Sequence, residues 1–421
     1  MKGRQVVFHI DANSAYLSWE AVYRLQHGAK VDLRKIPAVV GGNEENRHGI
    51  VLAKSIPAKA YNIKTGETLY SARQKCPSLV VVPPNYGLYM KCSNAMYEIL
   101  QEYSPYVQRF SVDECFLLYP EECLTEKYGE AEAAAYHLKE RIKNELGFTV
   151  NIGVSTNKLL AKMAGELKKP DLVHTIWPEE IKTKLWPLPV EELFMVGRAT
   201  KPKLHLMGIR TIGDLAQSDP KYLEQGLKSH GLLIWRYANG IDDSQFGGQR
   251  PFIKGIGNST TTAFNVEDQA TAYCFLLSLT EMVAYRLRQA RACCRLVAIS
   301  LKDNSFNYCS HQRKFTTATD STQVIYKAAC RLFDELWQKR QKPLRQLGVR
   351  VSELTWDSHL QLSLFNYQDV EKQQALDVAI DNIRRKYGPE SIIRSVFLHS
   401  GIAPLSGGVG EKEYQMMTSI L

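Results

Sequence analysis

The chain of 421 residues lacks any apolar stretch long enough to cross a membrane, and Asp11 interrupts its short N-terminal apolar run. A transmembrane helix needs about 20 mainly apolar residues, so neither a membrane span nor a signal peptide is predicted. The nine cysteines include no Cys-x-x-Cys spacing, and the adjacent pair Cys293-Cys294 is poorly placed for an ordinary disulfide. The sequence therefore indicates a cytoplasmic protein with reduced, mostly buried thiols.

Acidic residues are the scarcer charge, with 44 Asp and Glu against 53 Lys and Arg, which gives a net charge of +9. The excess of positive charge is concentrated between Arg250 and Asp357, where the sequence has 16 basic and 9 acidic residues. Such a segment favours a polyanionic partner. The length and a hydrophobic content of 44% predict two to four globular domains.

Against this basic background, two adjacent acids, Asp113 and Glu114, lie inside the apolar run 110–118. A third, Asp11, ends the strand-like run 6–11. Buried carboxylates need cationic partners, and distant acids that meet in a fold commonly hold a divalent metal. A hairpin tip or sheet edge is the alternative interpretation of the adjacent pair.

The order of predicted elements divides the chain into four parts. Up to about Asp171, strand-like and helical runs alternate, which predicts a mixed sheet covered by helices. Residues 177–243 are short helical pieces punctuated by Pro and Gly. A repeated helix-then-strand pattern between 268 and 351 predicts a small antiparallel sheet with two helices on one face. A polar stretch then precedes an amphipathic helix over 370–387, with Leu376, Ile380 and Ile383 on one face.

Several motifs in this order resemble those of the Y-family DNA polymerases, bacterial UmuC-like or DinB-like. Residues 8–16, Phe-His-Ile-Asp-Ala-Asn-Ser-Ala-Tyr, look like the first catalytic motif of that family, and Ser111-Val112-Asp113-Glu114 looks like the second. The resemblance implies an α+β right-hand polymerase. Its implied domains are a palm (1–22 and 80–171), fingers (23–79), a helical thumb with a helix-hairpin-helix (172–243), a little finger (250–357) and a C-terminal tail (358–421).

The resemblance also implies the roles of the residues around the catalytic motifs. Asp11, Asp113 and Glu114, with the main-chain carbonyl of Ala12, would bind two Mg²⁺ ions, and Tyr16 would be the steric gate that rejects a 2′-hydroxyl. An ordinary buried Tyr at a strand-to-helix junction is the alternative interpretation of Tyr16. The implied triphosphate contacts are Ser14, Lys59 and Lys162.

The fingers segment departs from the DinB-like pattern. Ala53, Ile56 and Lys59 stand where that pattern has a Thr, a Tyr and an Arg, and Lys59 in this setting is more like the UmuC branch.

The remaining implied contacts lie in the second half of the chain. The thumb would contact a DNA phosphate at Gly197 and Thr200, although Met195 stands where the first hairpin Gly is usual. The candidate backbone contacts of the little finger are Arg295, Lys302, Arg313, Lys314 and Arg350. A segment that resembles the bacterial sliding-clamp-binding peptide supplies Gln361, Leu362, Leu364 and Phe365, for which a buried strand is the alternative.

The resemblance therefore implies an error-prone translesion DNA polymerase, acting in the DNA-damage response without a proofreading domain. Its partners would be primer-template DNA, a deoxynucleoside triphosphate and the sliding clamp. Two rivals remain: another palm-type nucleotidyl enzyme such as a cyclase, and a catalytically idle clamp- and DNA-binding repair factor. The intact acids argue against the idle factor, because three costly carboxylates have no role in it.

Overall fold

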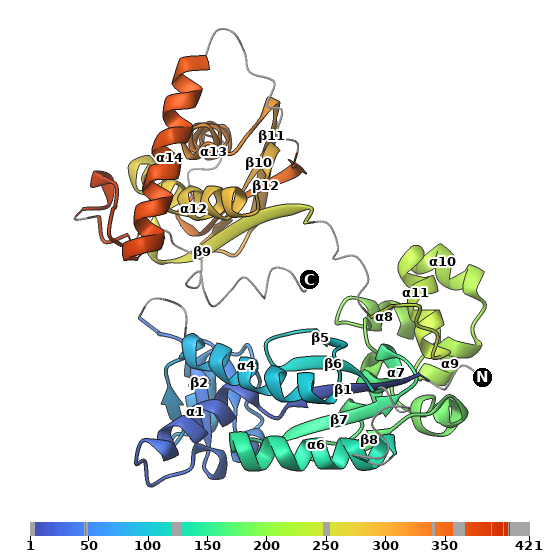
Figure 1. The fold of residues 1–421 in the computed structure, drawn as a ribbon. Coiled ribbons are helices and arrows are strands. Elements are labelled where there is room, and N and C mark those ends of the chain that lie inside the picture. The colour runs from blue at the N-terminus through green and yellow to red at the C-terminus, as the bar shows by residue number, and fades with distance from the viewer. Residues whose placement is uncertain are drawn as a thin grey trace. The chain divides into compact units, whose positions relative to one another are not determined.

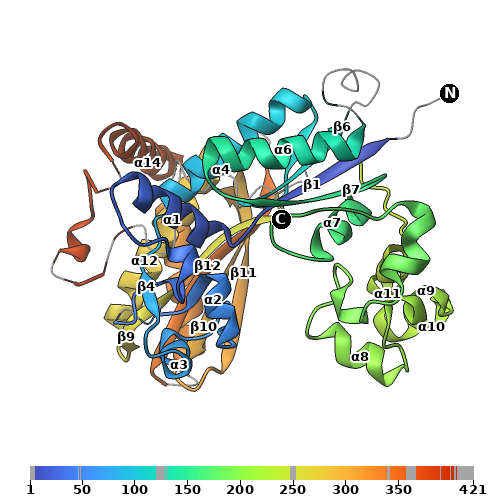
Figure 2. The same ribbon diagram turned by 90° about the horizontal axis from the view of Figure 1, so that it is seen from below.

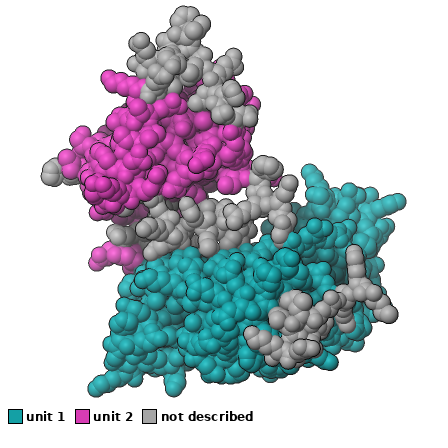
Figure 3. Space-filling model, viewed as in Figure 1, with its two compact units in different colours: residues 1–42, 50–250, 415–421 teal, residues 43–49, 251–414 magenta. Residues whose placement is uncertain are grey.

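The protein is represented by a computed structural model, which describes residues 5–45, 47, 49–119, 128, 130–246, 253–338, 342–356, 367–388, 390–398, 400–402 and 404, without side chains for 367–371. The chain forms two compact units (Figure 3). The described part of unit 1 lies within residues 5–42 and 50–246, and that of unit 2 within 43–49 and 253–404. No helix in these ranges is long and apolar enough to span a bilayer.

Unit 1 is built on a five-stranded sheet whose middle strand is β1 (Val6–Ala12), and all seven residues of β1 are buried. Both neighbours of β1 run antiparallel to it. The strand order is β5 (Val107–Arg109), β6 (Glu114–Tyr119), β1, β7 (Val150–Ser155) and β8 (Val173–Thr175). A central strand buried on both faces explains the continuous apolar run that precedes Asp11 in the sequence.

The two faces of this sheet are covered differently (Figure 2). One face packs on α1 (Ala15–Gln26), α4 (Tyr86–Tyr103) and α6 (Ala131–Leu146), which share a hydrophobic core with Phe8 and Ile10. The other face packs on α7 (Lys158–Glu166). Side chains alternate along a strand, so His9 and Asp11 lie on the α7 face.

Helix α7 approaches the sheet very closely at Gly153 in β7. A Cβ atom at this position would lie 1.9 Å from the carbonyl oxygen of Ala161 and 2.4 Å from the amide nitrogen of Gly165. Only a residue without a side chain fits there, so Gly153 fixes the distance between α7 and the sheet.

A second, three-stranded sheet in unit 1 has its own small core. Its order is β3 (Val51–Lys54), β2 (Ala38–Gly41) and β4 (Val80–Val82), and it carries α2 (Ile56–Ala60) and α3 (Leu69–Lys75). The chain leaves this sheet through β4 and enters α4 directly, because Asn85 caps α4 by accepting a hydrogen bond from the Leu88 amide at 3.1 Å.

The Pro- and Gly-punctuated region forms a helical cluster that shares α7 with the larger sheet (Figure 1). Its helices are α8 (Thr200–Leu206), α9 (Ile212–Gln217), α10 (Pro220–Leu227) and α11 (Ser229–Ala238). Leu159, Leu160 and Met163 of α7 lie in the core of this cluster. Helix α7 therefore ties the helical cluster to the acid-bearing sheet.

Unit 2 has the predicted architecture of a small antiparallel sheet with two helices on one face. The strand order is β11 (Tyr308–Thr319), β10 (Cys293–Asp303), β12 (Leu344–Thr355) and β9 (Gly255–Val266). Helices α12 (Gln269–Gln289) and α13 (Thr322–Trp337) pack on one side of it and close a single hydrophobic core. The helix-strand periodicity of the sequence thus predicts this unit well.

Helix α14 (Tyr367–Tyr387) belongs to unit 2 and is held there by buried charges. The Arg288 Nε of α12 lies 2.6 Å from Asp381 Oδ2, and an Arg384 guanidinium nitrogen lies 3.3 Å from Glu281 Oε2. All four side chains are largely buried. Residues 367–387 of the segment predicted as a tail are therefore part of a packed domain.

The predicted apolar stripe of this helix faces the domain only in part, because Ile380 is half-buried and the other two residues are exposed. Leu376 is 55% exposed and Ile383 is 37% exposed, whereas Asp377, one residue further along than Leu376, is 5% exposed. The helix is present as the pattern predicts, but ion pairs with α12 decide which face is buried. Hydrophobic periodicity cannot indicate such pairs, because their partners lie about 100 residues away in the sequence.

Candidate active site

The three predicted acids lie at one end of the central sheet, where the carboxylates of Asp11 and Glu114 are close together and that of Asp113 lies outside their group. The antiparallel register of β1 and β6 places Asp11 directly opposite Glu114. The Ala12 amide donates a hydrogen bond to the carbonyl oxygen of Asp113 at 3.0 Å, which holds the residue before β6 against the end of β1. Residues about 100 positions apart in the sequence are thus brought together by strand pairing.

The carboxylate of Asp11 lies in a poorly solvated environment. Its residue is 7% exposed, and burial raises its pKa to about 6 despite the nearby ammonium of Lys169, which donates a hydrogen bond to Asp11 Oδ2. Burial also raises the pKa of Asp113, although the Ser111 hydroxyl donates to Asp113 Oδ1 at 2.5 Å. Two of the three acids are therefore costly to ionise unless a cation joins them.

The third acid, Glu114, is already compensated. Burial works to raise its pKa, but His9 and Lys162 outweigh burial and bring the pKa down to about 2. Lys162 Nζ lies 2.8 Å from Glu114 Oε2, and His9 Nε2 lies 3.5 Å from the same oxygen. Glu114 is therefore a fixed anion over the whole physiological pH range.

Carboxylate oxygens of Asp11, Glu114 and Glu166 all lie within 4.8 Å of one another. Glu166, at the end of α7, is exposed and was not predicted as a site residue. These three carboxylates are hard oxygen donors, which is the donor chemistry that Mg²⁺ prefers, and Ala12 lines the cavity beside them. The residues present therefore fit a divalent cation.

A cavity of about 510 Å³ opens beside the acids and is lined by residues of unit 1. Asp11, Asp113 and Glu114 line it together with Tyr16 and Ser14. Ser14 has a left-handed backbone (φ 49°), so the chain turns sharply between β1 and α1 and presents both residues to the cavity. The basic side chains in the lining are Arg34, Lys54, Lys59 and Lys169.

Two lysines, one within α7 and one just after it, have different surroundings in the structure. Lys162, predicted as a triphosphate contact, pairs with Glu114, lies near the rings of Phe110 and Phe194, and is not among the residues that line the cavity. Lys169 lines the cavity and contacts both Asp11 and Glu166. Sequence reasoning missed Lys169, for which the only signal was its place just beyond the palm helix, in Lys168-Lys169-Pro170.

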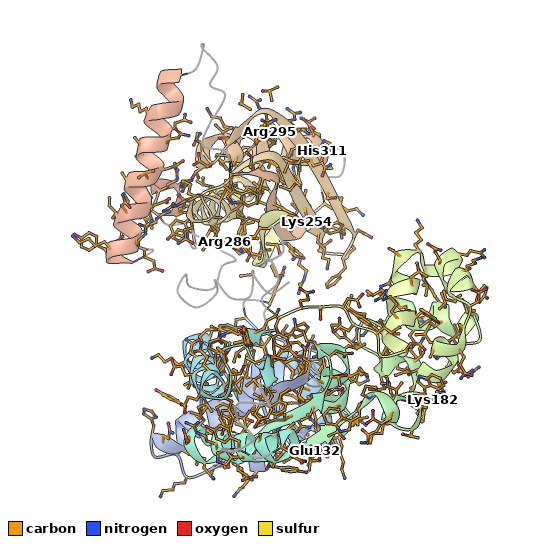
Figure 4. The ribbon with its side chains drawn as sticks, turned by 45° about the vertical axis from the view of Figure 1, so that its right-hand side comes forward. Glu132, Lys182, Lys254, Arg286, Arg295 and His311 are labelled. Carbon is orange, nitrogen blue, oxygen red and sulfur yellow. The ribbon has the colours of Figure 1, made fainter. Side chains whose placement is uncertain are left out.

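The predicted DNA contacts of unit 2, of which Figure 4 labels Arg295, do not all lie on one face of the sheet. Lys302, Lys314 and Arg350 alternate with residues buried against α12 and α13, so they lie on the helix-free face. Arg313 points the other way and pairs with Glu335 of α13 at 2.6 Å. Arg295 is exposed at a bulge in β10.

In the helical cluster, Thr200 begins α8, and the carbonyl of Gly197 accepts hydrogen bonds from the amides of Thr200 and Lys201. Met195 has a positive φ of 75°, the backbone conformation that explains why Gly is usual at this position. The predicted clamp residues Gln361, Leu362, Leu364 and Phe365 lie outside the described residues.

An acid-bearing sheet, a basic cavity beside it and a separate helical cluster define the class of right-hand, palm-type polymerases. The profile described as the impB/mucB/samB family matches residues 10–166, and the profile of that family's C-terminal domain matches residues 253–364. A DNA polymerase IV from Clostridium acetobutylicum is 46% identical over 395 residues, which cover 94% of this chain and 98% of the relative. A DNA polymerase IV from Acetivibrio thermocellus is 39% identical over 401 residues, with coverage of 94% and 98%.

Solved structures agree on the fold. A Y-family DNA polymerase chimera of Dbh and Dpo4 superposes with a TM-score of 0.70 at 21% identity, covering 84% of this chain and all of the chimera. DinB from Sulfolobus solfataricus gives a TM-score of 0.52 at 21% identity, with coverage of 82% and 98%. The chain belongs to the impB/mucB/samB family and is a DinB-like Y-family polymerase, a DNA-directed DNA polymerase. The relatives named DNA polymerase IV favour the DinB-like branch over the UmuC-like one suggested by Lys59.

Because the pKa of Asp11 is raised, the stability of the metal-free protein should depend on pH. A carboxyl whose pKa is about 6 when folded and 3.8 ordinarily favours folding below about pH 4, and this advantage is lost as the pH rises through 6. The loss amounts to about 3 kcal/mol at most. We expect Asp11→Asn to raise the free energy of unfolding at pH 8 by up to that amount relative to its effect at pH 4, measured by urea denaturation with a chelator present.

Asp32 provides the control of opposite sign. Although burial raises the pKa of Asp32, hydrogen bonds from Arg34 outweigh it and hold the pKa below its ordinary value. Asp32→Asn should therefore be about equally destabilising at pH 8 and pH 4, and its cost should shrink only as the pH falls below about 4. If the stability of the two variants depended on pH in the same way, the raised pKa of Asp11 would be contradicted.

Proposed function

We propose that the protein performs error-prone translesion synthesis, adding deoxynucleotides to a primer 3′-end opposite damaged template with two Mg²⁺ ions. The observation that carries this proposal is the convergence of Asp11, Asp113 and Glu114 beside a cavity lined by four basic side chains. The relatives named DNA polymerase IV support it, as does an insertion ternary complex of the similarly folded Dbh DNA polymerase. An idle repair factor would not need this arrangement, and a cyclase would not need the basic domain.

The residues of the site suit the reaction. Asp11, Asp113 and Glu114, with the Ala12 carbonyl, would hold the metal ions, which when bound neutralise phosphate charge and favour deprotonation of the primer 3′-hydroxyl. The triphosphate would lie along the basic lining of the cavity. We assign Lys169 and Lys59 to it in preference to Lys162, because only the first two line the cavity.

Few side chains of the cavity would contact the sugar and the base of the incoming nucleotide. Tyr16 lines the cavity next to the acids, where its ring would exclude a 2′-hydroxyl. Ala53 and Ile56 line the same cavity and carry no hydrogen-bonding side-chain groups. A nucleotide held mainly by charge and by a sugar filter would be accepted with imperfect base pairing, which supports low fidelity and tolerance of lesions.

The helix-free face of the unit 2 sheet is the surface that we assign to DNA. Its centre carries small residues, since a Cβ at Gly348 would lie 2.4 Å from Ser300 Oγ. Lys302, Lys314 and Arg350 lie on this face, where Lys314 Nζ also lies 2.6 Å from Glu353 Oε2. Cationic side chains around a flat polar surface fit a phosphate backbone without reading its sequence.

The metal assignment predicts the outcome of primer extension on undamaged and abasic templates. Asp113→Ala should lower nucleotide addition more than about a hundredfold, since even residues that only support a metal ligand are worth 10- to 100-fold. Primer-template affinity should stay within about tenfold, because basic residues elsewhere supply most of it. Robust extension by the variant would remove Asp113 from the catalytic set.

The two lysines make distinct kinetic predictions. Lys169→Met should raise the deoxynucleotide KM by about tenfold or more, because it removes a charge that binds substrate. Lys162→Met should instead lower kcat and raise the Mg²⁺ concentration needed for half-maximal rate, with the nucleotide KM changed less than about threefold, because its ammonium holds Glu114. Steady-state kinetics at saturating primer-template measure both. A larger nucleotide KM for Lys162→Met than for Lys169→Met would restore Lys162 as the triphosphate contact.

The sliding clamp is the partner we propose for the segment around Gln361. An enzyme held by non-specific phosphate contacts dissociates readily in physiological salt, and a tether to a ring on DNA raises its effective concentration at the primer end. Replacing Leu364 and Phe365 together by Ala should lower clamp binding and clamp-stimulated synthesis, and leave extension without clamp nearly unchanged. Equal loss in both assays would show instead that these residues pack inside the folded protein.

A further inference from the structure

The ring of Tyr16 is enclosed by aromatic side chains on the side away from the cavity. It stacks on Tyr89 with ring centroids 4.5 Å apart and an angle of 9° between the planes. Tyr86 meets it edge-on at 6.2 Å, and Trp19 lies tilted against it at 6.0 Å. Tyr16 lines the cavity, whereas the other three rings do not.

Tyr89 is the ring directly behind the gate. It is 1% exposed and belongs to the main hydrophobic core of unit 1. It also contacts Trp19 and Tyr86, at 6.0 Å in each case, so it is itself held on two sides. In a close-packed interior, a ring backed in this way has no free volume into which to retreat.

Tyr89 is positioned by the start of α4 and by the main hydrophobic core of unit 1. Tyr89 lies in the first turn of α4, whose start is fixed by the Asn85 cap. The ring of Tyr89 packs in the main core, which also contains Val40 of β2 and Val82 of β4, and not in the smaller core around Val39. The position of Tyr16 is thereby fixed by the same core that positions Asp11.

We propose that Tyr89 is a positioning residue for sugar selection, because its ring holds Tyr16 where a 2′-hydroxyl would clash. The inference rests on the proposed role of Tyr16 as the steric gate. Steric exclusion is effective only if the excluding group cannot move, since van der Waals repulsion fades over a displacement of about 1 Å. A gate without its backing ring would still be present but would yield to a ribonucleotide.

The experiment measures kcat/KM for a matched deoxynucleotide and ribonucleotide in single-nucleotide incorporation. Tyr89→Leu should lower discrimination by about tenfold or more, mainly by raising ribonucleotide kcat/KM, as expected when a repulsive contact is relaxed. Tyr89→Phe keeps the stack and should leave discrimination within about threefold of the wild type. Tyr16→Ala should lower discrimination furthest, and adding Tyr89→Leu to it should change little more, because the ring that Tyr89 supports is gone.

A matched control is available on the same helix. Tyr103 is fully buried in the same core, and its ring stacks on Tyr128 at 4.4 Å, away from the gate. Tyr103→Leu should lower stability as Tyr89→Leu does and leave discrimination unchanged. If Tyr89→Leu does not fold, Tyr89→Met replaces it, since the longer side chain fills more of the ring's volume.

The outcomes separate the inference from the function on which it rests. Unchanged discrimination in Tyr16→Ala would overturn the steric gate itself. Loss of discrimination in Tyr16→Ala but not in Tyr89→Leu would overturn the positioning role alone. An equal loss in Tyr103→Leu would overturn it as well, since general loosening of the core would then explain the effect.

Discussion

Burial of ionisable carboxylates is the constraint on which the site depends. Strand pairing forces Asp11 opposite Glu114 with Asp113 alongside, and burial makes the ionised forms of Asp11 and Asp113 unfavourable. The protein compensates part of this cost with Lys162 on Glu114 and Lys169 on Asp11. What remains uncompensated favours a divalent cation, so the electrostatic strain of the metal-free site is the basis of its proposed chemistry.

Helix α7 connects this strained site to the rest of unit 1. One face of α7 lies on the sheet so closely that only Gly153 fits beneath it, and the other face contributes Leu160 and Met163 to the core of the helical cluster. The same helix carries Lys162 and ends at Glu166. Any shift of α7 would therefore change the surroundings of the acids, which explains why rigid packing and a functional site coincide here.

Tyr16 and the acids share one source of rigidity. Tyr16 follows Asp11 by five residues, and its ring packs through Tyr89 into the core that also contains Phe8 and Ile10 of β1. Selection of the sugar would thus be set by the interior of the protein, not by the cavity surface alone. In unit 2, by contrast, the helix-free face that we assign to DNA would need only small residues and flexible cations, because phosphate contacts tolerate imprecise placement.

The sequence by itself determined the elements whose signal is local. The apolar run before Asp11 predicts a buried central strand, the acids within 110–118 predict a site, and helix-strand periodicity predicts the architecture of unit 2. The tertiary structure decided the features that depend on where a helix ends and on the direction in which a side chain points. Lys162 and Lys169 are seven residues apart, a spacing that shares a face on a continuous helix, but α7 ends at Glu166 and only Lys169 reaches the cavity.

The direction of side chains in unit 2 follows the same logic. Arg313 and Lys314 are adjacent and chemically alike in the sequence, yet strand alternation turns Arg313 toward Glu335 and leaves Lys314 on the helix-free face. Helix α14 is predicted by its amphipathic pattern, but buried pairs such as Arg288 with Asp381 leave Leu376 and Ile383 of its apolar stripe exposed. Periodicity fixes which residues share a face, and only long-range partners decide which face is buried.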